Sequence, residues 1–218
     1  NSSHPDHLIR HDLCEEAMRL CMLLINNCVT NTPKVQALLA LMCFQASRED
    51  ARLGDDGGII LLKDQDRSRW SQPLIEKGKF YLEHSAEGNV FSEHHLEAAI
   101  AGCHAKALSF ERTNWKEIQQ LYTILSQIKP GPFVELNKAI AIGYGESPAA
   151  GLTALAEINE LQNHYLYHAA KGDFLAELGN LEQARTSYEL ALYLTSSNTE
   201  KTLLQAKLIS LGITARQL

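Results

Sequence analysis

The sequence predicts an all-α fold of stacked helical hairpins, with one short irregular or β-hairpin segment near residues 53–70. Three observations support this prediction. Apolar residues recur at helical spacing along most of the chain, Pro and Gly separate the periodic stretches, and the second half repeats a unit of about 34 residues. The 218 residues are 45% hydrophobic, which is sufficient for a buried core.

The first half predicts four helices around the irregular segment. Cys14, Cys21 and Cys28 are seven residues apart, so they share one face of the first helix, where we expect them to pack in the core. Thr32 and Pro33 begin a second helix that runs to about residue 52 and forms an antiparallel hairpin with the first. After the irregular segment, helices are predicted over residues 72–86 and 92–108.

The second half predicts a regular succession of helices. They are expected over residues 115–128, 133–143, 165–178, 181–194 and 199–211, with a further helix that is capped by Ser147 and has Pro148 in its first position. Gly212 is expected to end the last helix. The prediction therefore divides the chain into an N-terminal helical region, residues 1–110, and a region of repeats with a C-terminal capping helix, residues 111–218.

The repeat is the most specific pattern in the sequence. Residues 165–198 resemble a tetratricopeptide (TPR) unit, a helix–turn–helix in which small residues let the two helices approach each other. The signature positions are Gly172, Gly179, Ala184, Tyr188 and Ala191. Residues 132–164 match more weakly, and the helices over 92–108 and 115–128 resemble a third unit. The expected architecture is a TPR-like right-handed superhelix.

Composition and motifs argue against several classes of function. The chain has 26 acidic and 20 basic residues, and its net charge is −6, so we expect neither direct DNA binding nor membrane binding. No nucleophile–base motif, phosphate loop or metal-binding signature is present, which predicts no enzyme, no cofactor and no metal. His4, His7 and His11 have ligand-like spacing but lie near a polar terminus. Five cysteines without CxxC spacing predict a cytoplasmic protein with reduced thiols.

One segment at the junction between irregular chain and helix concentrates charge. It contains Asp64, Asp66, Arg67, Arg69 and Trp70. One interpretation is a docking surface, because Arg and Trp are frequent interface anchors. The other is an ion-pair and capping network that fixes the loop onto the helices, and both can hold. We expect Trp70 to be buried with its indole N–H bonded, and at least one Arg to contact an Asp or a backbone carbonyl.

The same segment carries a resemblance to a known family. Residues 62–70 (LKDQDRSRW), together with 74–78 (LIEKG), 12–20 (DLCEEAMRL), 38–42 (LLALM), 98–105 (AAIAGCHA) and 134–141 (VELNKAIA), resemble the C-terminal extension of certain bacterial extracytoplasmic-function (ECF) sigma factors. The resemblance implies a regulatory module that acts with sigma-factor core domains, and indirectly with RNA polymerase or a regulatory protein. The alternatives are a stand-alone TPR adaptor for a peptide or protein, and a helical enzyme or ligand sensor that uses the charged segment.

Overall fold

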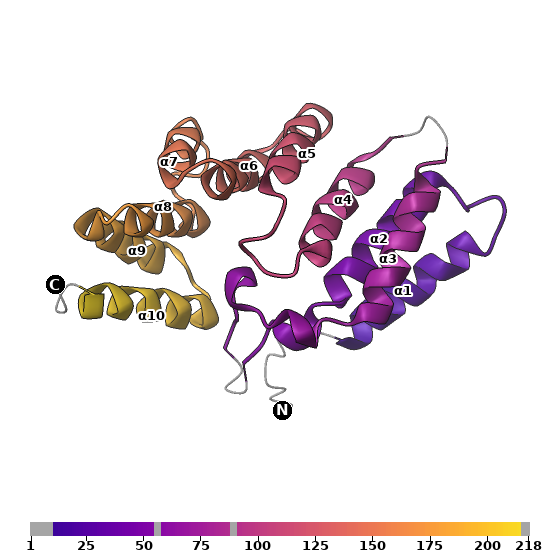
Figure 1. Ribbon diagram of the computed structural model, residues 1–218, viewed down its shortest axis with the longest axis horizontal. Coiled ribbons are helices and arrows are strands. Elements are labelled where there is room, and N and C mark those ends of the chain that lie inside the picture. The colour runs from indigo at the N-terminus through magenta and orange to yellow at the C-terminus, as the bar shows by residue number, and fades with distance from the viewer. Residues whose placement is uncertain (1–10, 55–57, 88–90, 215–218) are drawn as a thin grey trace. The chain divides into compact units, whose positions relative to one another are not determined.

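The computed structural model describes residues 11–54, 58–87 and 91–214, and these residues form an all-α protein. The described part of the chain contains ten α-helices, three short 3-10 helices and no β-strand (Figure 1). The predicted fold class is therefore confirmed. Contacts divide the chain into two compact units: residues up to Arg52 with Leu61–Thr113, and Leu53–Ile60 with residues from Asn114 onward. The expected boundary between residues 110 and 111 differs from this division mainly in the placement of Leu53–Ile60.

The first unit is built around one central helix. Its α-helices are α1 (His11–Ile25), α2 (Pro33–Ala46), α3 (Gln72–Ser85) and α4 (Glu93–Lys106). Helix α2 packs against α1, α3 and α4. This position requires apolar residues around most of the helix, and Ala37, Leu39, Ala40, Cys43 and Phe44 are all buried. The Thr32 hydroxyl accepts a hydrogen bond from the Val35 N–H, and Pro33 occupies the first turn, as the sequence predicts.

Phe44 fixes the close packing of α2 on its neighbours. Its ring is 1% exposed. A Cβ atom added at Gly78 of α3 would lie 2.8 Å from Phe44 Cε1, and one added at Gly102 of α4 would lie 3.4 Å from Phe44 Cε2. Glycine at position 78 therefore makes the space that the ring fills, whereas a Cβ at position 102 would make an ordinary van der Waals contact with it.

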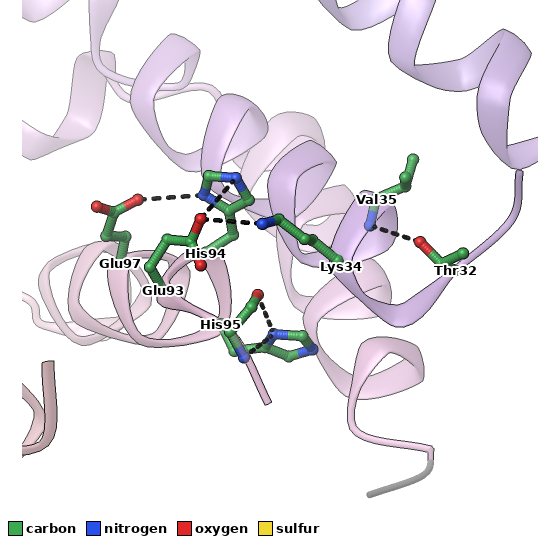
Figure 2. Close-up of polar contacts among 8 residues, drawn as sticks. Thr32, Lys34, Val35, Glu93, His94, His95 and Glu97 are labelled. Carbon is green, nitrogen blue, oxygen red and sulfur yellow. Dashed lines mark hydrogen bonds and ion pairs between the residues drawn. The ribbon is translucent and has the colours of Figure 1, made fainter. Parts of the chain in front are cut away.

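A polar network connects the start of α2 with the start of α4 (Figure 2). Lys34 Nζ lies 3.0 Å from Glu93 Oε1, and His94 lies between the carboxylates of Glu93 and Glu97. The buried His95 accepts a hydrogen bond from the Ser92 backbone N–H through Nδ1, so it completes the cap of α4. These histidines have local structural partners, as expected of solvated or core histidines.

The second unit is a succession of helices in which each packs against the next in the chain. Its helices are α5 (Trp115–Ile128), α6 (Pro132–Gly145), α7 (Pro148–Ala156), α8 (Tyr165–Glu177), α9 (Leu181–Leu194) and α10 (Asn198–Thr214). Contacts join α5 to α6, α6 to α7, α7 to α8, α8 to α9 and α9 to α10 (Figure 1). This near-neighbour packing is typical of helical repeat proteins.

In the second unit, the ring of Phe174 fills the space between closely packed helices, as the ring of Phe44 does in the first unit. A Cβ at Gly143 would lie 2.1 Å from Phe174 Cζ, and a Cβ at Gly151 would lie 2.7 Å from both the Phe174 ring and the Gly143 Cα. The ring of Phe174 is 1% exposed. Helices α6, α7 and α8 therefore meet at this ring, and two glycines provide the space that it needs.

The structure corrects two details of the sequence prediction and decides between two alternatives for a third. Helix α10 continues through Gly212 to Thr214, so this glycine does not end it. Cys28 is exposed because α1 ends at Ile25, whereas Cys21 is buried and Cys14 partly buried. Of the two forms expected near residues 53–70, the described part shows the irregular one and not a β-hairpin. An isolated antiparallel bridge joins Leu53 to Ile59, and two 3-10 turns follow.

Candidate functional site

The charged segment of the first unit is folded as two 3-10 turns, η2 (Leu62–Asp64) and η3 (Arg67–Arg69). Asp66 caps the second turn, because its Oδ1 accepts hydrogen bonds from the Ser68 N–H at 2.9 Å and from the Ser68 hydroxyl at 2.7 Å. These bonds lower the pKa of the exposed Asp66 carboxyl below its usual value. The segment then leads into α3, where the Ser71 N–H donates to the Ser47 carbonyl at 2.8 Å.

Trp70 anchors this segment in the core of the first unit. Its side chain is 3% exposed and belongs to a buried cluster that also contains Phe44 and Ile75. Two guanidinium groups lie against its ring: the Arg67 Cζ is 4.7 Å from the ring centroid, and the Arg48 Cζ is 5.6 Å from it. Both distances fall in the range of cation–π contacts. The predicted burial of Trp70 is confirmed.

Arg67 fastens the segment to the end of α4. Its Nη1 donates hydrogen bonds to the carbonyl of Ala107, at 2.9 Å, and to the carbonyl of His104. The last carbonyls of a helix have no partner within the helix, and they carry partial negative charge. The guanidinium group of Arg67 therefore donates to two carbonyls at the end of this helix. The expected contact between an Arg and a backbone carbonyl is confirmed.

The cluster around Trp70 is strongly cationic for a half-buried site. Burial, followed by the charges of Arg52 and Arg67, lowers the pKa of Arg48 to about 10. Burial also lowers the pKa of Arg67. The pKa of His104 falls to about 4, mainly because the side chain is buried and then because Arg48 and Arg67 lie nearby. At neutral pH the cluster therefore holds two positive guanidinium groups and a neutral imidazole.

The five residues singled out by the sequence are divided between two environments. Trp70 belongs to the buried cluster and the half-buried Arg67 lies against its ring, whereas Asp64, Asp66 and Arg69 are exposed. The predicted hydrogen bond of the Trp70 indole is wrong, because Nε1 is buried and has no hydrogen-bond partner among the described residues. Sequence reasoning missed Arg48 and recognised His104 only as a core or solvated histidine. The approach of Arg48 to Trp70, and of His104 to the two arginines, depends on packing between distant segments.

The TPR signature residues of the second unit meet between α8 and α9. Ala184 and Ala191 are both 0% exposed, and Tyr188 is 3% exposed. A Cβ at Gly172 would lie 2.5 Å from Tyr188 Cε1, so glycine makes room for this ring. Gly179 has a φ of 76° in the turn between the two helices, a conformation that favours glycine.

A polar triad links the last three helices of the second unit. The Tyr188 hydroxyl donates to Asp173 Oδ1 at 2.7 Å, and Lys207 Nζ of α10 lies 2.7 Å from Asp173 Oδ2. The Lys207 ammonium also lies 5.4 Å from the centroid of the Tyr188 ring. Burial and the nearby Asp173 raise the pKa of Tyr188, so the phenol stays protonated and donates. The triad fixes α10 on the α8–α9 hairpin.

The first unit also contains a groove. It has a volume of about 610 Å³ and lies between α1 and α2. Its lining is largely apolar and also includes three polar side chains, Gln45, Glu49 and Arg52. The other lining residues are Leu13, Cys14, Ala17, Met18, Leu41, Met42 and Ala46. The neighbouring Glu49, through hydrogen bonding, and burial raise the pKa of the Cys14 thiol, which keeps it protonated and poorly nucleophilic.

Within the described residues, no group of three or more His, Cys, Asp or Glu side chains has a geometry that could hold a metal ion. His4 and His7 lie outside the described residues, and His11 pairs with Glu49 at 2.7 Å.

The described helices include none with the length and apolar character needed to cross a membrane.

Comparisons with known proteins identify two regions. Residues 1–86 match the model of a family of unknown function (DUF6596), and residues 144–213 match the model of a tetratricopeptide repeat-like domain. The chain is 35% identical over 198 residues to the uncharacterized protein R00370 of Rhizobium meliloti (strain 1021). That match covers 90% of this chain and 47% of the relative, so the chain spans about half of the relative's length.

No solved structure matches the chain significantly. The second unit is TPR-like on two grounds: its sequence matches a TPR-like family model, and each of its helices packs against the next. Such helical stacks act as protein-interaction modules.

Proposed function

We propose that the chain is a non-catalytic interaction and regulatory module of an ECF-type sigma factor, which modulates transcription initiation by RNA polymerase. Three observations support the proposal. The motifs along most of the chain resemble the C-terminal extension of such factors. The second unit is TPR-like and suited to protein partners. The related R. meliloti protein is about twice as long as the matched region, and that length could hold further domains.

The main support for the proposal is that the charged segment has one side packed against the protein and one side exposed to solvent. Its buried side, Arg67 and Trp70, holds the backbone against α4 and the core. Its other side presents Asp64, Asp66 and Arg69 to solvent on short, hydrogen-bonded turns. A surface whose backbone is fixed before binding loses less entropy on association, which favours a docking role for the exposed side chains.

Substitution of the exposed arginine tests this role. In the full-length protein, we expect Arg69→Ala to reduce transcription from a target promoter without a change in thermal unfolding, because the side chain is exposed and outside the buried cluster. Arg112→Ala is the matched control, since it also removes an exposed positive charge from the same unit. Equal activity of Arg69→Ala, Arg112→Ala and wild type would contradict the docking role of this segment.

The coding sequence upstream of Asn1 separates this proposal from a stand-alone TPR adaptor. We expect it to encode the promoter-binding and polymerase-binding domains of a sigma factor. The stand-alone adaptor is the second candidate function. The TPR-like match is the one observation that supports it. A gene without sigma-type domains would reject the regulatory proposal and leave the adaptor.

A further inference from the structure

The cluster around Trp70 contains hydrogen-bond donors that the protein does not use. Arg48 Nε, Arg67 Nη2 and Trp70 Nε1 are buried and have no hydrogen-bond partner among the described residues. All three are obligatory donors, because neither a guanidinium group nor an indole N–H can accept a hydrogen bond. Leaving such groups buried and unpaired is unfavourable, because the hydrogen bonds that they make to water in the unfolded chain are lost without replacement. Three of them around one aromatic ring therefore indicate a missing acceptor.

The charge of the cluster indicates the sign of that acceptor. The guanidinium groups of Arg48 and Arg67 lie 5.6 and 4.7 Å from the same ring centroid. Neither forms an ion pair with a carboxylate among the residues that the structure describes. Glu111 acts on Arg67 only through its longer-range charge, and it is exposed. A water molecule could accept hydrogen bonds here but would leave both positive charges uncompensated.

The arrangement also restricts the size and class of the ligand. The three unpaired N–H groups are enclosed, which excludes a large ligand from direct contact with all of them. Guanidinium groups bind carboxylate and phosphate oxygens particularly well, and a tetrahedral oxyanion can accept from several donors at once. Because the cluster carries two positive charges, a dianion compensates it better than a monovalent carboxylate or chloride does.

We propose that Arg48, Arg67 and Trp70 form a binding site for a small phosphate-type oxyanion, either inorganic phosphate or the phosphate group of a small metabolite. Arg67 keeps its bonds to the carbonyls at the end of α4 through Nη1 and offers Nη2 to the ligand. Arg48 supplies Nε from the turn that follows α2. The ligand thereby connects the end of α2, the charged segment and the end of α4, so its arrival stabilises the first unit. This site does not depend on the proposed role in transcription.

Ligand-dependent unfolding of the intact chain tests the site. Thermal unfolding is followed in sodium phosphate and in sodium chloride of equal ionic strength, with Trp fluorescence recorded in a Trp115→Phe background so that Trp70 alone reports. We expect a saturable rise in the unfolding temperature and a saturable change in Trp70 fluorescence with phosphate. A response no larger than that to chloride would overturn the proposal, because the donors then bind water only.

Two variants and two further ligands make the test specific. Arg48→Gln should fold, because it removes an uncompensated charge, and its phosphate affinity should fall at least tenfold. Arg112→Gln should respond like wild type, since it removes an exposed charge from the same unit. An unchanged phosphate response in Arg48→Gln would overturn the proposal.

Two further ligands define the class of anion. If glycerol 3-phosphate binds more tightly than inorganic phosphate, the ligand is a phosphorylated metabolite. If acetate gives the same response as phosphate, the phosphate class is rejected.

Discussion

Gly172→Ala should destabilise the α8–α9 hairpin, although alanine is the better helix former. The added Cβ would lie 2.5 and 2.6 Å from two atoms of the Tyr188 ring. The ring cannot move aside easily, because it is 3% exposed and its hydroxyl is bonded to Asp173 at 2.7 Å. Overpacking of this kind costs about 1–3 kcal/mol, while the gain in helix propensity is about 1 kcal/mol. The expected net loss in the free energy of unfolding is about 0–2 kcal/mol.

Gly212→Ala isolates the steric effect, because no atom outside the local helix lies within 4 Å of a Cβ at that position in α10. Only the propensity gain applies there, and it stabilises by at most about 1 kcal/mol. Urea unfolding of the two variants, followed by circular dichroism, should place them about 1–3 kcal/mol apart. Hydrogen exchange at the amides of α8 and α9 should locate the weakened region in Gly172→Ala. If Gly172→Ala were as stable as Gly212→Ala, Tyr188 would not pack against Gly172.

Further predictions concern both units. Trp70→Ala should lower the free energy of unfolding by about 3–5 kcal/mol, measured in urea, because a fully buried aromatic side chain is lost. His104 has a folded-state pKa of about 4, below its ordinary value, so the unfolded chain binds more protons between pH 4 and 6.5. Stability should therefore be full above pH 6.5 and fall by about 3 kcal/mol as the pH drops to 4, and His104→Gln should flatten this dependence in thermal unfolding. Ala184→Leu and Ala191→Leu should each destabilise by about 1–3 kcal/mol, and unchanged thermal unfolding of both would contradict the repeat register. The chain should give no sequence-specific shift with duplex DNA in a gel assay, because acidic residues outnumber basic ones by 26 to 20.

The parts of the fold that depend on local chemistry could be predicted from the sequence. Thr32 with Pro33, and Ser147 with Pro148, mark the beginnings of α2 and α7 as predicted. Gly179 occupies the turn between α8 and α9. These residues act on their own stretch of backbone, so their effect is visible in the sequence. Gly212 shows the limit of this reasoning, since α10 passes through it.

The candidate site was less predictable because it is assembled from distant segments. The sequence indicated that Trp70 and an Arg would be structural, and it placed them in one short segment. It carried no sign that Arg48, from the turn after α2, would lie against the same ring as Arg67. The structural interpretation of the segment was an ion-pair and capping network, and Asp66 supplies a cap within its own turn. Packing between distant segments therefore determines that Arg48 and Arg67 lie together at the Trp70 ring without a carboxylate partner among the described residues.

The close approach of α6, α7 and α8 around Phe174 has a consequence for how this protein can evolve. Gly143 and Gly151 leave no room for a side chain, and the ring of Phe174 occupies the space that they provide. A larger residue at either glycine clashes with the ring, and a smaller residue at Phe174 leaves a cavity. Each single change is therefore selected against while the partners remain. We expect homologous sequences to keep the three residues together or to replace them in combination, so that covariation at these positions should identify proteins that share this packing.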